Sequence, residues 1–211
     1  MSVDDATGTK MNTTKSQTSD CPGKMCARDR ILAAAADLFY REGIRAVGIE
    51  AVIEKAGVAK MSLYRSFPSK DDLVAAFLAD RNRRYWLWWD EIVAAGDASP
   101  RVQLSNLFKA LSQRVSSPDY RGCAFVNTAI EFPDPSHPGH AVALANKREL
   151  RHRLTLLTSA LGVASAQSLA DQLMLLMEGA YSLGNTLGRD DSPVTSVTAA
   201  AEALIDAAVR N

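Results

Sequence analysis

The stretch that decides the fold lies near the N-terminus and reads, from residue 56 to residue 73, AGVAKMSLYRSFPSKDDL. Gly57 follows a segment of helical apolar pattern at 49–56 and permits a tight turn before a second short segment of the same kind. Pro68 stops that second segment, and Ser69 can cap a long helix that opens with acidic residues. Two short helices joined by a tight turn form a helix-turn-helix, so this stretch predicts a DNA-binding motif.

The second short helix, at about 60–66, has an inner and an outer face. Leu63 and Phe67 are four residues apart and are expected to face the core. The other side chains point outward, where a helix in a major groove meets bases and phosphates. Lysines can neutralise phosphates, Tyr64 offers a hydroxyl, and Arg65 can contact guanine or a phosphate. The predicted DNA-binding residues are Lys60, Met61, Ser62, Tyr64, Arg65, Ser66 and Lys70.

A longer helical segment at 27–42 precedes the motif. Its apolar face is formed by Ile31, Ala34, Ala35, Leu38 and Phe39, and Gly43 follows it. Together with the stretch at 56–73, this segment resembles the tetracycline-repressor (TetR) family of one-component regulators, over about residues 26–75. The resemblance implies a three-helix DNA-binding domain, which we place at 24–69. It also implies a variable helical domain for ligand binding and dimerisation, which we place at 70–211.

Two parts of the motif depart from the pattern of the family. Gly48 stands where the family usually has Thr or Ser, which would cap the helix at 49–56. Glycine serves there at a cost of roughly a few tenths of a kcal/mol, but it offers no hydroxyl to a phosphate. Arg65 and Ser66 replace a commoner aromatic–His pair. The resemblance therefore predicts a DNA-binding helix without predicting the operator sequence.

Composition excludes several classes of protein. The chain has 211 residues, 47% of them hydrophobic, with 24 Lys and Arg against 24 Asp and Glu, which does not fit a collagen-like, coiled-coil or wholly disordered chain. No apolar run reaches the roughly 18 residues of a membrane span, and the N-terminus does not resemble a secretory signal. Three cysteines give no disulfide framework. We therefore expect a soluble cytoplasmic protein with reduced thiols and no membrane partner.

The charge is unevenly distributed along the chain. Residues 24–84 carry 12 Lys and Arg and 8 Asp and Glu, a net charge of +4. Residues 85–211 carry 10 and 13, a net charge of −3. This asymmetry indicates a basic N-terminal module that faces an anionic partner.

Beyond the motif, helical patterns continue to the end of the chain. Residues 1–23 lack apolar periodicity, and 8 of the first 20 are Ser or Thr, so we expect a disordered N-terminal arm. No stretch alternates in the manner of strands and turns. The further predicted helices, separated by Gly- or Pro-containing breaks, lie at about 70–95, 100–116, 124–131, 138–161, 165–187 and 193–210. The sequence thus predicts an all-α fold of about nine helices.

The segment at 70–95 carries apolar residues on two faces, which is typical of a helix buried between others. Its aromatic cluster could line a ligand pocket or fill a core, and the sequence leaves both readings open. The predicted ligand-binding residues are Tyr85, Trp86, Trp88, Trp89, Phe108, Phe125, Asn127, Met174, Met177 and Tyr181. They indicate a small, largely apolar or aromatic inducer of unknown identity.

The last two predicted helices indicate a homodimer interface. Apolar residues recur at helical spacing in both, and the small ones among them allow close helix approach. The recurring residues are Leu169, Leu173, Leu176, Met177 and Ala180, and Ala200, Ala203, Leu204, Ala207 and Ala208. An intramolecular hairpin is the alternative. A dimer is favoured because a helix-turn-helix protein that binds a palindrome needs two-fold symmetry.

The residues that could support catalysis or metal binding form no recognisable set. Cys123 could act with His137, His140 and Glu131 as nucleophile and base, but no spacing joins them. His137 and His140 lie three residues apart, and no second pair completes a metal site. No phosphate-binding glycine motif is present in the sequence. We therefore expect neither an enzyme nor a cofactor nor a metal.

The predicted function is that of a ligand-responsive transcriptional regulator. It would be a repressor that binds a palindromic operator in double-stranded DNA as a homodimer and is released by a small molecule. One alternative is a DNA-binding protein without ligand control, which a tightly packed C-terminal domain would favour. The other is a helical small-molecule-binding module or enzyme without specific DNA binding, which convergent polar side chains in the pocket would favour.

Overall fold

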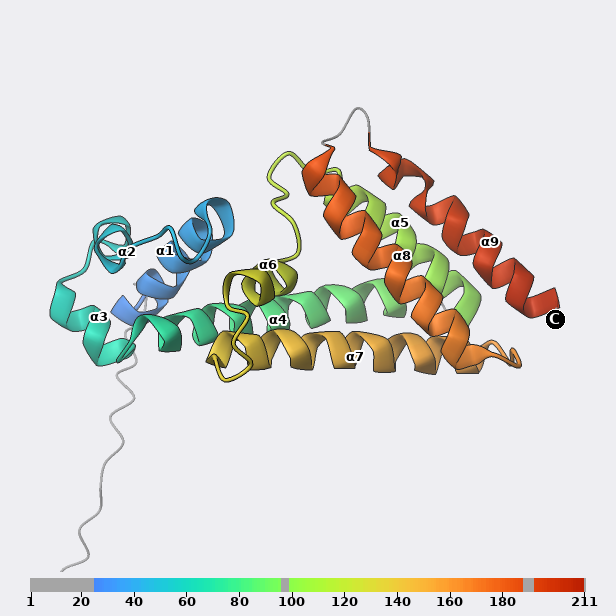
Figure 1. The fold of residues 1–211 in the computed structure, drawn as a ribbon, viewed down its shortest axis with the longest axis horizontal. Helices are drawn as coiled ribbons and strands as arrows, with labels where there is room; N and C mark the ends of the chain where they lie inside the picture. The colour runs from blue at the N-terminus through green and yellow to red at the C-terminus, as the bar shows by residue number, and fades with distance from the viewer. Residues whose placement is uncertain (1–24, 96–98, 188–191, 211) are drawn as a thin grey trace, which may run out of the picture.

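The computed structural model describes residues 25–95, 99–187 and 192–210, so the predicted arm at 1–23 lies outside the described residues. Within these ranges the chain forms nine α-helices and one short 3-10 helix, and no strand, which confirms the all-α prediction (Figure 1). The helices are α1 (Ala27–Glu42), α2 (Ile49–Ala56), α3 (Lys60–Ser66), α4 (Lys70–Ala94), α5 (Pro100–Val115), α6 (Ala124–Glu131), α7 (Pro138–Ala160), α8 (Ala166–Thr186), η1 (Pro193–Ser196) and α9 (Val197–Arg210).

Local signals set the geometry of the helix-turn-helix. Gly57 ends α2 in the left-handed conformation, with φ of 60°, which side chains rarely adopt. Its N–H donates to the carbonyl of Glu54, and the N–H of Val58 donates to that of Ile53. These two bonds satisfy the last carbonyls of α2 and turn the chain sharply into α3.

A capping box starts the long helix α4. The hydroxyl of Ser69 accepts from the backbone N–H of Asp72, and the Asp72 carboxylate accepts from the backbone N–H of Ser69, each at 3.1 Å. Pro68 precedes the cap, where the chain cannot continue helically from α3. The reciprocal pair therefore fixes where α3 ends and α4 begins.

The long helices α4 and α7 lie side by side along the longest dimension of the molecule (Figure 1). Helices α1–α3 pack at the N-terminal end of α4, whereas α5, α8 and α9 gather at its other end, with α6 between the two groups. Residues in the first half of α4, such as Phe77, belong to the buried cluster around α1–α3. Tyr85 and Trp89, farther along, belong to the other buried cluster. One continuous helix thus connects both cores.

Much of the stripe on α8 that the sequence suggested for the dimer interface faces the core of the protomer, although Leu176 and Ala180 also border an apolar groove beside α9. Leu169, Leu173, Met177 and Ala180 are each at most 5% exposed. Helix α8 is apolar on more than one side, and periodicity alone does not say which side packs internally. Leu175, by contrast, is 74% exposed. Among the described helices, none has the length and apolar character that crossing a membrane would require.

Candidate nucleic-acid interface and ligand pocket

Helix α3 presents an outer face whose orientation follows from its buried side. Leu63 is fully buried, and Phe67, directly after the helix, is almost so. The guanidinium of Arg28 on α1 lies 4.7 Å from the centre of the Phe67 ring and covers it. Because these contacts hold one side of α3, the opposite side stays open, and there Met61 is 78% exposed and Tyr64 is 40% exposed.

The cations of α3 are exposed. Lys60 and Arg65 both face solvent, and the Nζ of Lys60 lies 3.2 Å from Oε1 of Glu50 on α2. The Lys60 ammonium lowers the pKa of the Glu50 carboxyl, so that carboxylate stays ionised at neutral pH. Exposed ion pairs are weak, so Lys60 can leave Glu50 at little cost.

The remaining predicted DNA-binding residues are partly covered. Ser62 and Ser66 are half-buried, and the hydroxyl of Ser66 donates to the carbonyl of Ser62 at 2.9 Å. Lys70, at the start of α4, is also half-buried, and its Nζ lies 6.0 Å from the centre of the Phe39 ring. The structure therefore places all the predicted residues on or directly beside α3, and their contacts with DNA stay a prediction.

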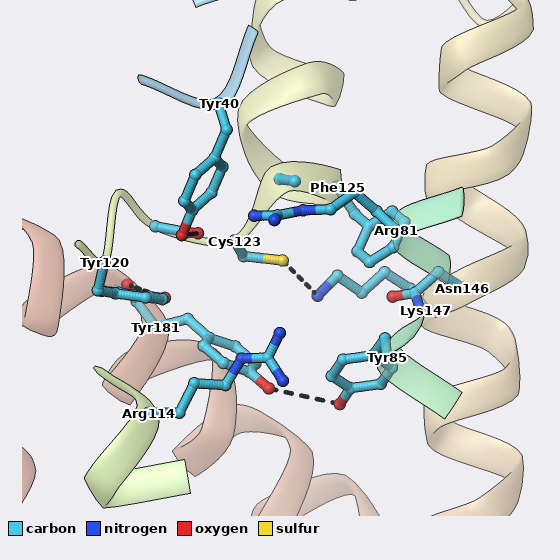
Figure 2. Close-up of a pocket in the computed structure, with 12 residues that line it drawn as sticks. Tyr40, Arg81, Tyr85, Arg114, Tyr120, Cys123, Phe125, Asn146, Lys147 and Tyr181 are labelled. Carbon is cyan, nitrogen blue, oxygen red and sulfur yellow. Dashed lines mark hydrogen bonds between the residues drawn. The ribbon is translucent and has the colours of Figure 1, made fainter. Parts of the chain in front are cut away.

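A pocket lies between α4, α5, α6, α7 and α8 in the other half of the molecule (Figure 2). Its volume is about 40 Å³, room for on the order of two water molecules. A second, outer groove of about 310 Å³ shares Gly122, Cys123 and Tyr181 with the pocket. The two spaces are therefore neighbours, separated by a thin wall of side chains.

The predicted ligand-binding residues divide between this site and the core. Tyr85, Phe125 and Tyr181 line the pocket, and Asn127 lines the outer groove. Residues that pack in or against the buried core without lining the pocket are Trp86, Trp88, Trp89, Phe108, Met174 and Met177. Successive residues of a helix point in different directions, so an aromatic run on α4 cannot face one pocket as a whole.

Two arginines that sequence analysis did not select line the pocket (Figure 2). The guanidinium of Arg81 on α4 lies 3.8 Å from the centre of the Tyr40 ring, and burial lowers the pKa of Arg81. The guanidinium of Arg114 on α5 lies 4.9 Å from the centre of the Trp88 ring and 5.8 Å from that of Tyr85. Arg81 has a signal in the sequence, because it precedes Tyr85 by one turn on a largely apolar face, but Arg114 has none.

Lys147 on α7 adds a third cation to the wall of the pocket. Its Nζ donates to Oε1 of Glu178 on α8 at 2.5 Å and to Sγ of Cys123 at 3.4 Å. The ion pair with Glu178 is partly buried. Lys147 is therefore neutralised within the protein, at the boundary between the pocket and the outer groove.

A chain of tyrosine hydroxyls completes the wall. The hydroxyl of Tyr120 donates to the backbone carbonyl of Tyr181 at 3.0 Å, and the hydroxyl of Tyr181 donates to that of Tyr85 at 3.4 Å. Burial raises the pKa of all three phenols, so they remain protonated at neutral pH. Among the described residues, none accepts the hydroxyl hydrogen of Tyr85, which can therefore donate into the pocket.

Tyr40 joins the helix-turn-helix bundle to the pocket. It belongs to α1, yet its ring lines the pocket beneath Arg81. Its hydroxyl donates to the carbonyl of Gly122 at 3.1 Å and accepts from the backbone N–H of Arg121 at 3.0 Å. A second link lies nearby, where the backbone N–H of Arg45 donates to Glu131 of α6 at 2.7 Å. The segment around α6 thus contacts both the pocket and α1.

The structure does not assemble the catalytic or metal sets considered from the sequence. Cys123 faces Lys147, whereas the ring of His137 stacks on Phe132 at 4.0 Å and its Nδ1 accepts from the backbone N–H of Gly139. In the ranges for which coordinates are described, no group of three His, Cys, Asp or Glu side chains could hold a metal ion.

The comparisons with known proteins agree with the fold and the motif. The family described as "Bacterial regulatory proteins, tetR family" matches residues 31–77. The crystal structure of a TetR transcriptional regulator, sav143, from Streptomyces avermitilis MA-4680 superimposes with a TM-score of 0.74 at 33% identity. That superposition covers 87% of this chain and 98% of the other.

Two curated relatives support the same assignment. The HTH-type transcriptional regulator YjdC of Escherichia coli K12 is 26% identical over 155 residues, which is 74% of this chain and 81% of YjdC. The HTH-type transcriptional repressor KstR2 of Rhodococcus jostii RHA1 is 36% identical over 127 residues, which is 58% of this chain and 51% of KstR2. The chain therefore belongs to the TetR family and is a DNA-binding transcriptional regulator rather than an enzyme.

Proposed function

We propose that the protein is a cytoplasmic repressor that binds a palindromic operator as a homodimer and is released by a small molecule. Residues 24–69 would form the DNA-binding domain, and residues 70–211 the ligand-binding and dimerisation domain. The observation that carries the proposal is the geometry of α3, where buried Leu63 holds the helix and Met61 and Tyr64 face outward. The repressor KstR2 and the regulator YjdC among its relatives support the same reading.

Each side chain on α3 has a chemical role in this proposal. Lys60 and Lys70 neutralise phosphates, and the hydroxyl of Tyr64 donates to another phosphate. Arg65 can form two parallel hydrogen bonds with a guanine, and the apolar chain of Met61 suits the methyl group of a thymine. The half-buried Ser62 and Ser66 contact the sugar-phosphate backbone of the DNA at the edges of the same surface.

The surface between α8 and α9 is the proposed dimer interface. An apolar groove of about 300 Å³ runs between these helices and η1. Leu175, Leu183 and Gly179 of α8 border it together with Ala200 of α9. Covering such a groove with a second copy removes apolar surface from water. A two-fold axis there would place both copies of α3 in successive major grooves, roughly 34–36 Å apart.

The pocket is the proposed inducer site. Tyr85, Phe125 and Tyr181 contact the ligand directly, Asn127 lies at the outer groove, and the other predicted aromatic and methionine side chains support these walls from behind. To release DNA, the ligand must bind better to the state that does not bind DNA, and the coupling is reciprocal. Tyr40 can transmit the effect of the ligand from the pocket to the DNA-binding domain. A ligand that moves Arg81 also disturbs the contact between Tyr40 of α1 and the segment before α6.

The test is a selection of binding sites from random and genomic DNA with the purified full chain, at a stated salt concentration of about 150 mM. We expect a palindromic site to be enriched. The Tyr64→Ala/Lys60→Ala double variant should lose it, whereas Lys109→Ala, an exposed change on α5, should retain it. A folded dimer that enriches no sequence, with and without prior removal of bound small molecules by dialysis, would contradict the proposal.

A further inference from the structure

The pocket contains more positive charge than its walls neutralise. Lys147 pairs with Glu178, so that pair is neutral as a whole. Arg81 and Arg114 form no ion pair with any carboxylate in the described parts of the chain. Both guanidinium groups point toward the same space (Figure 2). The positive charge of Arg114 adds to the effect of burial and lowers the pKa of Arg81 further, which places the two groups within electrostatic reach of each other.

Aromatic side chains hold these arginines, and Arg81 also has a hydrogen bond to Tyr40, but these contacts supply no negative charge. Arg81 lies over Tyr40, and Arg114 lies over Trp88. A ring face attracts the flat side of a guanidinium, but the five N–H donors lie along its edge and need acceptors. Partly buried charge without a counter-charge is unfavourable, so the two half-buried guanidinium groups favour the entry of an anion.

We propose that the pocket binds a small aromatic carboxylate, whose acid group lies between Arg81 and Arg114. Carboxylate oxygens match the fork of a guanidinium, and the free hydroxyl of Tyr85 supplies a further donor. The aromatic body of the ligand packs against Phe125 and Tyr181. This inference rests on the proposed function, because it names the chemical class of the inducer.

The ligand needs more room than the pocket offers by itself. The pocket measures about 40 Å³, and the adjoining groove measures about 310 Å³. Together they reach the range of roughly 300–1,000 Å³ that is usual for ligand sites. Lys147 stands at the boundary on a long unbranched side chain, so its movement away from Cys123 joins the two spaces. Binding therefore selects a more open arrangement than the one described.

The same anion couples the pocket to α1. A carboxylate that draws the guanidinium of Arg81 into the pocket removes it from the ring of Tyr40. Tyr40 then loses the contact on one side while its hydroxyl still bonds Gly122 on the other. The position of α1 thus depends on where Arg81 points, which gives a charged ligand a direct effect on the DNA-binding end.

The experiment compares acids with their neutral amides by calorimetric titration of the purified full chain. The probe pairs are benzoate and benzamide, phenylacetate and phenylacetamide, and 2-naphthoate and 2-naphthamide. We expect at least one acid to bind, with its amide weaker by about tenfold or more. Equal binding of acid and amide overturns the inference, as does the absence of binding by every acid up to about 10 mM.

Variants identify the residues that recognise the charge. Arg114→Gln and Arg81→Gln should each weaken binding of the acid by about tenfold or more and leave binding of the amide nearly unchanged. Arg148→Gln, the same change at an exposed position of α7, is the matched control and should bind as the parent does. Arg114→Lys keeps the positive charge but loses the forked geometry of the guanidinium, so it should retain part of the binding of the acid. This variant serves as the test if Arg114→Gln folds poorly. An equal loss in Arg148→Gln overturns the assignment.

A separate operator-binding titration distinguishes the failure of this inference from the failure of the proposed function. If the amides bind and release DNA while the acids do not, the repressor function is supported, and the inference that the pocket binds a carboxylate is wrong. If the acids bind but operator affinity is unchanged, the pocket does take aromatic carboxylates, but the proposal that the ligand releases DNA is wrong. If no operator is bound in any condition, the proposed function itself fails.

Discussion

Helix α3 and the pocket both gather positive charge, but they hold it in opposite ways. On α3, Lys60 is exposed and pairs with Glu50. In the pocket, Arg81 and Arg114 lie against aromatic rings, and no carboxylate of the described residues pairs with them. An exposed pair exchanges partners at little cost, whereas enclosed charge without a partner is unfavourable. If α3 binds DNA and the pocket binds a ligand as proposed, the surface of α3 suits reversible contact with many phosphates, and the pocket suits one complementary anion.

The two regions also differ in how they are assembled. The predicted DNA-binding residues come from a single stretch, 60–70, held by two buried residues, Leu63 and Phe67. The wall of the pocket comes from six separate helices, α1 among them, and the segment before α6. A change in Leu63 therefore acts on one region alone, whereas a change in Tyr40 acts on the junction of both.

The largest expected effect comes from a substitution of Leu63, the buried anchor of α3, which should affect the DNA-binding end and not the pocket. Leu63→Ala should lower the free energy of unfolding of the DNA-binding end by about 2–5 kcal/mol, because it leaves a cavity beneath the helix. Operator binding should be lost while the helices around the pocket stay folded. Chemical denaturation followed by circular dichroism, together with operator titration, measures both effects.

The control for this change is on the same helix. Met61→Ala removes an exposed side chain and should change stability by less than about 0.5 kcal/mol, although it weakens operator binding. Equal destabilisation by both substitutions would show that Leu63 is not the anchor.

A smaller effect tests the junction between the regions. Tyr40→Phe removes the hydroxyl that bonds Gly122 and Arg121 but keeps the ring beneath Arg81. Stability should fall by about 0.5–1.5 kcal/mol, and the amide of Arg121 should exchange its hydrogen faster. The factor by which a bound carboxylate weakens operator binding should fall toward one, since the coupling passes through this contact.

Tyr120→Phe provides the comparison for Tyr40. It removes a hydroxyl that bonds the carbonyl of Tyr181, entirely within the ligand-binding part. A similar loss of stability with unchanged coupling is expected. If Tyr120→Phe and not Tyr40→Phe loses the coupling between carboxylate and operator binding, that coupling does not pass through Tyr40.

The smallest expected effect concerns the ion pair on the DNA-facing surface. Glu50→Gln releases Lys60 and should strengthen operator binding by about two- to fivefold, as expected for a weak exposed pair. Glu54→Gln, one turn later on α2, makes the same change of charge at an exposed residue and is the control. Fluorescence anisotropy with labelled operator measures both affinities. Equal gains in the two variants would mean that general repulsion by DNA, not the ion pair, explains the effect.

Sequence reasoning worked best where the deciding interactions are local. The limits of α1, α2 and α3 agree with those predicted, because Gly57, Pro68 and the cap at Ser69 act through neighbours in the chain. The all-α fold and the family resemblance followed from the same signals. The outer face of α3 was predictable as well, since burial of Leu63 determines which side chains remain outside.

The helices, their breaks and the helix-turn-helix motif could therefore be predicted from the sequence, because they depend on contacts within a few residues. The tertiary structure alone decided what lines the pocket. Arg114 and Lys147 line the same pocket as Tyr85 only because α4, α5 and α7 pack together, and no local pattern in the sequence predicts that arrangement. It also decided which apolar side of α8 was left exposed. Periodicity shows that a helix has a side to bury, but the neighbouring helices determine which side that is.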